Sequence, residues 1–75
     1  MRSATEAVIH AVGYVMNMPT DALDATTPFG SIGADSVALI VIADVIEEHN
    51  AFLVPNDVLK AANTVADLAA GLESR

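Results

Sequence analysis

The sequence predicts an all-α fold, in which three main helices and one short helix pack as a four-helix bundle. Apolar residues recur at helical spacing in three separate segments. Stretches rich in Pro, Gly, Asp and Asn divide these segments, and the longest stretch becomes a loop between the first two helices. Only one segment resembles a strand, and no second candidate exists to pair with it.

The size of the chain limits it to one domain, and we expect residues 1–75 to form it. The core of so small a domain is marginal and often needs disulfides or metals. Cysteine is absent, which excludes disulfides and thiolate metal sites. Tryptophan is also absent, so the core is expected to be aliphatic. The short chain has no linker tails, which favours a free-standing protein.

The first helix is expected over residues 5–16. Ser3 and Glu6 have the capping-box spacing, in which each side chain accepts a hydrogen bond from the other residue's amide. Pro19 ends the helix soon after residue 16. The apolar residues at helical spacing within it are Val8, Ile9, Val12, Val15 and Met16.

Residues 17–35 are expected to form a long loop. A loop of this length in a small domain tends to be functional. Its two isolated acids, Asp21 and Asp24, do not fit a calcium-binding loop, so we expect a turn and a cap there. Three apolar residues are expected to anchor the loop to the core: Leu23, Phe29 and Ile32.

The second helix is expected over residues 36–49. Its first half is rich in β-branched residues, so a buried strand is the alternative. The apolar pattern continues without a break through residue 46 and into two acids. That length favours a helix.

Two further helices are expected in the last third of the chain. Asn56 is expected to cap a short helix over residues 57–62. Asn63 or Thr64 would then cap a last helix that ends near Leu72. One apolar stripe of that helix would face the core: Val65, Leu68, Ala69 and Leu72.

The charge of the chain excludes several classes of partner. Ten acidic residues and three basic ones give a formal net charge of −7. Three basic side chains are too few to neutralise a nucleic acid backbone. The same charge disfavours anionic membranes and favours partners with basic patches. The longest apolar run is about half the length needed to span a bilayer, so we expect a cytoplasmic protein. We expect it to be a monomer.

Ser36 is the most informative residue, because it stands where the loop meets the longest apolar run. At the start of a helix its hydroxyl would lie near unpaired amides and the positive end of the helix dipole. A phosphate ester would be stabilised there, as other anions are at helix N-termini. The structural alternative is that Asp35 or Ser36 only caps the helix.

The stretch Gly33-Ala34-Asp35-Ser36-Val37 resembles the Gly-x-Asp-Ser-Leu motif of acyl carrier proteins. The likeness covers nearly the whole chain. Glu47 and Glu48 resemble the acidic end of that family's second helix, and residues 64–68 are similar to its Thr-Val-x-Asp-Leu signature. The five-residue motif is moderately specific alone and strong when combined with chain length, acidity and helix layout.

The resemblance implies that Ser36 receives a 4′-phosphopantetheine arm from coenzyme A, added by a phosphopantetheinyl transferase, with support from Asp35. The thiol of the arm would carry acyl groups as thioesters to acyl-loading and acyl-processing enzymes of fatty acid or polyketide biosynthesis. The protein itself would not be an enzyme, because it lacks a catalytic constellation. A metal site is not expected, since His10 and His49 lie on different helices, where both are expected to be exposed.

The second helix departs from the pattern of fatty-acid carriers. Those carriers usually bear acids two and five residues after the serine, where this chain has Ala38 and Val41. With Val37 these residues would form an apolar contact patch for partners, and burial is the alternative. The acids follow later in the helix, as a solvated face or a surface for basic patches on partner enzymes: Asp44, Glu47 and Glu48.

Two other functions stay open. A peptidyl or aryl carrier of a nonribosomal pathway is favoured by the apolar face of the second helix. Those carriers more often have Gly-Gly-x-Ser, and Asp35 keeps the motif on the acyl-carrier side. The third hypothesis is a small acidic helical adaptor that binds partners non-covalently, with Ser36 as a helix cap.

Overall fold

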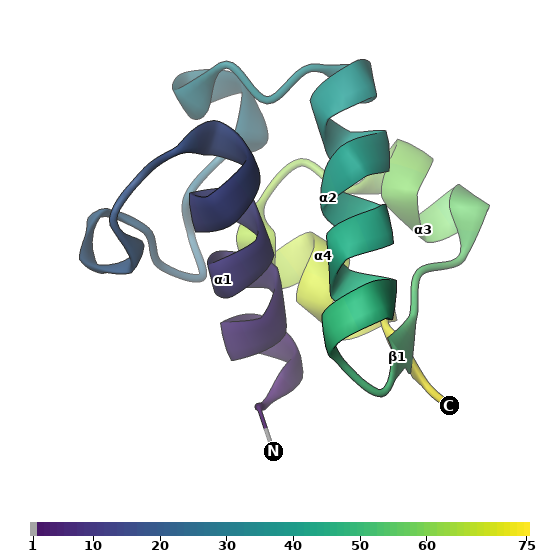
Figure 1. The fold of residues 1–75 in the computed structure, drawn as a ribbon. Helices are drawn as coiled ribbons and strands as arrows, with labels where there is room; N and C mark the ends of the chain where they lie inside the picture. Colours follow the sequence, from purple (N-terminus) through teal and green to yellow (C-terminus); the bar gives the residue numbers. More distant parts are fainter. Residues whose placement is uncertain (1) are drawn as a thin grey trace.

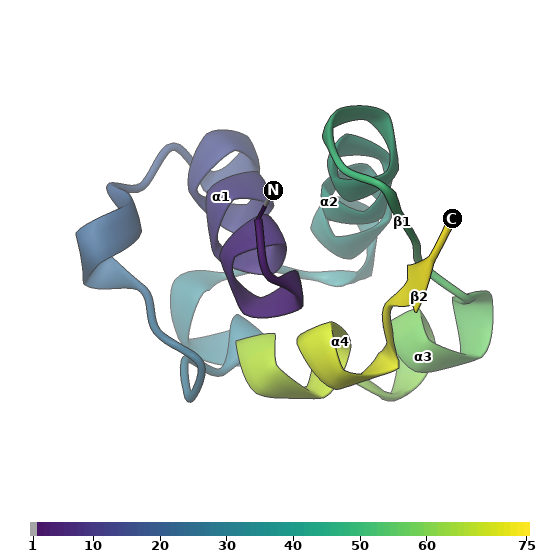
Figure 2. The same cartoon turned by 90° about the horizontal axis from the view of Figure 1, so that it is seen from below.

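The computed structural model describes residues 2–75, which contain four α-helices. α1 (Ala4–Met16) and α2 (Ser36–His49) lie side by side, and α4 (Val65–Gly71) packs against α1. α3 (Asn56–Ala61) contacts both α2 and α4, and Figure 2 shows it beside α4. The expected all-α bundle, with a long loop between its first two helices, is therefore confirmed (Figure 1).

The core is aliphatic, as the composition predicts. Its fully buried large side chains come from α1, α2 and α4: Val8, Val12, Ile42, Ile46, Val65 and Leu68. One aromatic ring joins them, because Phe29 from the loop is only 3% exposed. No polar or charged residue among those described is buried, so the core is held by apolar packing alone.

The capping box at the start of α1 is present. The Glu6 amide donates to Ser3 Oγ at 3.2 Å, and the Ser3 amide donates to the Glu6 carboxylate at 3.1 Å. The bond from the Ser3 amide, with help from the Ser3 hydroxyl, lowers the pKa of Glu6. The helix ends at Met16, and Asn17 takes the left-handed conformation that terminates many helices.

The loop between α1 and α2 contains two short 3₁₀ helices, Thr20–Ala22 and Phe29–Ile32. Its three predicted anchors are confirmed: Leu23 and Phe29 are buried, and Ile32 is half-buried against the core. Asp24 forms a turn rather than a calcium site. Its carboxylate accepts hydrogen bonds from the Thr26 hydroxyl at 2.7 Å and the Thr26 amide at 2.8 Å, which lower the pKa of Asp24.

Backbone hydrogen bonds attach this loop to the link between α3 and α4. The Phe29 amide donates to the Asn63 carbonyl at 2.9 Å, and the Val65 amide donates to the Thr27 carbonyl at 3.1 Å. The loop is therefore held at both its side chains and its backbone shortly before α2 begins. This attachment limits where the first turn of α2 can lie.

The last third of the chain differs from expectation in two details, the start of α3 and the length of α4, and decides between two predicted caps for α4. Asn56 does not cap α3: the helix begins one residue earlier, because the Leu59 amide donates to the Pro55 carbonyl at 3.0 Å. Of the two residues expected to cap α4, Thr64 forms the cap, in a capping box with Asp67. α4 has seven residues and α3 has six, so the chain has two long helices and two short ones.

A two-residue strand pair is the other difference. β1 (Phe52–Leu53) pairs antiparallel with β2 (Glu73–Ser74), which brings the C-terminus beside the end of α2. The last helix also meets α3 closely, since a Cβ on Gly71 would overlap the side chain of Val58. Glycine at this position therefore permits the close approach of α4 to α3.

Candidate functional site

A sharp turn leads the chain into α2. Gly33 has φ of +74°, a left-handed conformation that glycine adopts without the penalty other residues incur. Its amide closes the preceding 3₁₀ helix by donating to the Phe29 carbonyl. Ala34 is then buried, whereas Asp35 and Ser36 are exposed. The buried ring of Phe29 and the glycine turn thus present the next two residues to solvent.

Asp35 caps α2. Its carboxylate Oδ1 accepts a hydrogen bond from the Ala38 amide at 2.9 Å. The cap interpretation thus holds for Asp35 and leaves the Ser36 hydroxyl outside it. Ser36 is the first residue of the 14-residue helix. Its exposed Oγ therefore lies at the positive end of the helix dipole.

Ser36 is one of the residues that line a groove between α2 and α3, which has a volume of about 420 Å³. Three residues of each helix line it at the spacing that places them on one face. Ser36, Leu39 and Ile40 come from α2, and Asn56, Leu59 and Lys60 come from α3. Its volume is within the range of small-molecule sites. An exposed hydroxyl beside a partly apolar groove fits an attached, chain-like group.

The patch predicted beside Ser36 is mostly exposed. Val37 is 68% exposed and Val41 is 44% exposed, whereas Ala38 is half-buried and packs against the core. Ile40, at 56% exposure, is a further member that the sequence reasoning missed. Its position three residues after Val37 was the available signal, since that spacing places both on one helix face.

The acids of α2 lie in different environments. Asp44 and Glu48 are exposed. Glu47 is half-buried, and its carboxylate accepts a hydrogen bond from the Val54 amide at 2.8 Å. Glu47 therefore connects α2 to the segment before α3, and only the other two acids are fully available to a partner.

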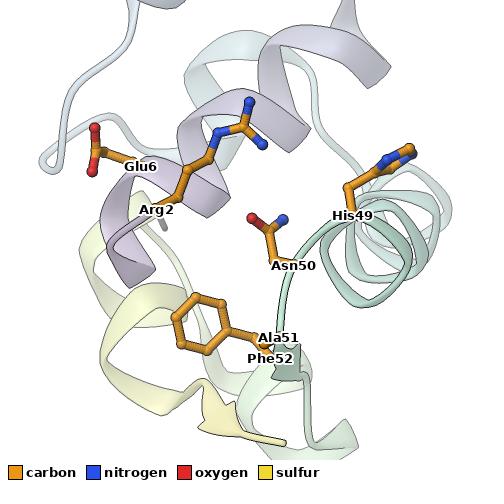
Figure 3. Close-up of a pocket in the computed structure, with 6 residues that line it drawn as sticks. All are labelled: Arg2, Glu6, His49, Asn50, Ala51 and Phe52. Atoms are coloured by element: carbon orange, nitrogen blue, oxygen red, sulfur yellow. The ribbon is translucent and has the colours of Figure 1, made fainter.

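A second cavity, of about 490 Å³, lies at the far end of α2 (Figure 3). Arg2 and His49 flank Asn50 there, about 20 Å along the helix from Ser36. His10 joins His49 in an adjoining cavity of about 280 Å³, and both histidines are exposed, as expected. Residues 2–75 contain no group of three or more side chains able to hold a metal ion.

Comparison with known families identifies the class of protein. The family described as a phosphopantetheine attachment site matches residues 6–72. The match covers most of the chain, so the chain belongs to this family. It is a phosphopantetheine carrier protein whose cofactor is a covalently bound 4′-phosphopantetheine group.

The matched region runs from the first turn of α1 to the residue after α4 and includes the loop and both walls of the groove. The resemblance to acyl carrier proteins is therefore confirmed. No curated protein and no solved structure matches the chain. Within residues 2–75, none of the helices combines the length and the apolar character needed to cross a membrane.

Proposed function

We propose that Ser36 is the attachment residue, and that the protein carries acyl groups between enzymes of a fatty acid or polyketide pathway. One observation supports this most: an exposed serine begins α2 three residues after a left-handed glycine, in a chain of the phosphopantetheine family. When bound, the arm supplies a thiol that holds the acyl group as a thioester. The chain has no cysteine to compete for that group.

Ser36 Oγ would form a bond to the pantetheine-side phosphorus of coenzyme A while the pyrophosphate bond breaks on a phosphopantetheinyl transferase. The leaving group is 3′,5′-ADP, and the proton of the serine hydroxyl passes to a base of the transferase. Asp35 supports this step in two ways. Its cap on the Ala38 amide holds the first turn of α2, and with it the Ser36 side chain. Its charge also lies beside the serine, where it can orient a metal-bound phosphate donor on the transferase.

Partner enzymes would contact α2. Near Ser36 the exposed side chains of Val37, Ile40 and Val41 offer apolar contacts. Further along, Asp44 and Glu48 are exposed to basic patches. The half-buried Ala38 and Glu47 would contribute edge contacts beside these residues.

The apolar side chains beside Ser36 also support a second candidate, a peptidyl or aryl carrier of a nonribosomal pathway. An enzyme that recognises such a carrier would present an apolar surface instead of a basic one. The non-covalent adaptor hypothesis loses its basis, since the chain belongs to a family that carries a covalent cofactor.

Intact-mass analysis tests the proposal. The protein is incubated with coenzyme A and a broad-specificity phosphopantetheinyl transferase, and we expect the mass to rise by one arm. Ser36→Ala should lose this gain completely and keep its circular dichroism spectrum, because Ser36 is exposed and Asp35 forms the cap. Ser74→Ala, at an exposed serine in β2, is the matched control and should gain the arm.

No gain on the native chain, or a gain that persists in Ser36→Ala, would contradict the proposal. Loading the arm-bearing protein with acyl, aminoacyl and aryl donors then separates the two candidates. Preferred loading by acyl donors supports the fatty acid or polyketide type. Preferred loading by aminoacyl or aryl donors supports the nonribosomal type.

A further inference from the structure

The wall of the groove opposite Ser36 carries a basic side chain, Lys60. The chain has only three lysines and arginines in total. The other two lie at the far end of α2: Arg2 lines the cavity beside His49, and the Arg75 amide donates to the Ala51 carbonyl at 3.0 Å. This strongly acidic protein therefore has one of its few cations on the groove that Ser36 also lines.

A phosphodiester on Ser36 would be negatively charged and adjacent to the carboxylate of Asp35. That carboxylate already occupies the Ala38 amide, one of the donors at the positive end of α2. The two negative charges would repel each other, and a cation on the opposite wall would offset this repulsion. The ammonium group of Lys60 provides three donors for such a contact.

We propose that Lys60 binds the phosphodiester of the arm and so positions the arm over the groove between α2 and α3. This inference rests on the proposed attachment at Ser36. The apolar part of the groove, formed by Leu39, Ile40 and Leu59, would receive the apolar portions of the arm and its cargo. Asn56 shares a face of α3 with Lys60 and offers an amide to the amide groups of the arm.

A simpler role of Lys60, at the end of α3, must be distinguished from binding of the phosphodiester. It lies in the last turn of α3, where a cation interacts favourably with the end of a helix. That interaction would be the same with or without the arm. The two roles are therefore separated by the difference in Tm between the arm-bearing and arm-free forms of each variant.

The experiment uses both forms of the native chain, Lys60→Met, Lys60→Arg and the control Arg75→Met. Lys60→Met removes the charge and keeps an unbranched side chain, whereas Arg75→Met makes the same charge change at an exposed site remote from the groove. Two quantities are measured in low and high salt. These are the change in Tm on attachment of the arm and the ³¹P chemical shift of the phosphodiester.

In low salt, attachment should raise the Tm of the native chain by about 1 to 5 °C more than that of Lys60→Met. Lys60→Arg and Arg75→Met should behave like the native chain. The ³¹P signal of Lys60→Met should be shifted from the native position. Both differences should diminish in about 1 M salt, because the contact is exposed and screened.

The inference would be overturned if attachment of the arm changed the Tm of the native chain and of Lys60→Met equally, with coincident ³¹P signals. A loss of Tm in Lys60→Met that is the same with and without the arm would assign Lys60 to the end of α3 and also overturn it. So would an effect seen only after loading a carboxyl-bearing acyl group, since the cargo would then be the anion. A native chain that gains no mass refutes the attachment site itself, before Lys60 is tested.

Discussion

α2 has two apolar stripes that face in opposite directions. The inward stripe contains Ile42 and Ile46, which are both fully buried. The outward stripe contains Val37, Ile40 and Val41, which are 44% to 68% exposed. The two stripes consist of the same kinds of residue, but only the inward one contributes to the core. The outward stripe lies beside the candidate serine and is therefore available to partners.

The outward surface also changes character along the helix. Its first half is apolar, and its second half exposes Asp44 and Glu48. Apolar contacts contribute affinity over short range, whereas exposed charges act mainly on the encounter between partners. We therefore expect the region around Ser36 to decide which partner binds, and the acids to affect how fast it arrives.

The largest expected effect concerns the inward stripe. Ile42→Ala should lower the free energy of unfolding by about 2 to 5 kcal/mol, because it removes buried methyl groups and leaves a cavity. Ile40→Ala, its matched control on the outward stripe, should change it by no more than about 0.5 kcal/mol. Urea denaturation measures both. Similar losses in the two variants would refute the division of α2 into two stripes.

A smaller effect on the free energy of unfolding is expected for the Asp35 cap at the start of α2. Asp35→Ala should lower the free energy of unfolding by about 1 kcal/mol, because the Ala38 amide loses its acceptor. Asp35→Asn should keep the cap and remove only the charge. Denaturation of both variants, with the rate of arm attachment by the transferase, separates the two roles.

If Asp35→Asn receives the arm at the native rate, the charge of Asp35 has no part in attachment, and the residue acts only as a cap. If Asp35→Asn is stable but slow to receive the arm, the charge is needed. A loss of stability in Asp35→Asn equal to that in Asp35→Ala would contradict the assigned cap geometry.

The smallest expected effect on stability concerns the outward stripe. Val41→Glu should change the free energy of unfolding by about 0.5 kcal/mol or less, since Val41 is partly exposed. Loading by an enzyme with an apolar docking surface should fall by about tenfold, because one apolar contact is replaced by a charge that must lose its water. Measurements of kcat/KM for loading check this.

Ala66→Glu is the control for Val41→Glu, because it adds the same charge at an exposed position of α4. It should leave loading unchanged. If Val41→Glu unfolds, Val41 belongs to the core and the docking role is lost. If both variants reduce loading equally, the effect comes from net charge and not from the outward stripe.

The sequence predicts well those features that depend on neighbours within a few residues. The capping box at Ser3 and the extent of α2 both follow from local patterns. The pairing of β1 with β2 was not predictable, because it joins two-residue segments about twenty positions apart. Two residues are too few to show an alternating pattern.

The candidate site also has one part that neighbouring residues indicate and one part that depends on distant segments. The motif around Ser36 indicated the serine, because the glycine turn, the acid and the helix start are consecutive in the chain. Lys60 was not singled out, since only the packing of α3 next to α2 brings it to the groove of Ser36. The sequence also did not show that Ile40 faces solvent, because the second helix is apolar on most of its faces.

The sequence by itself determined the class of fold, the order of the helices and the serine at the start of α2. Each of these depends on residue type and short-range spacing, which act before the chain is packed. Only the tertiary structure decided which valines and isoleucines of α2 are covered, and that a lysine faces the groove. Burial and groove walls depend on how α1 and α3 pack against α2, and residue spacing along one helix does not contain that information.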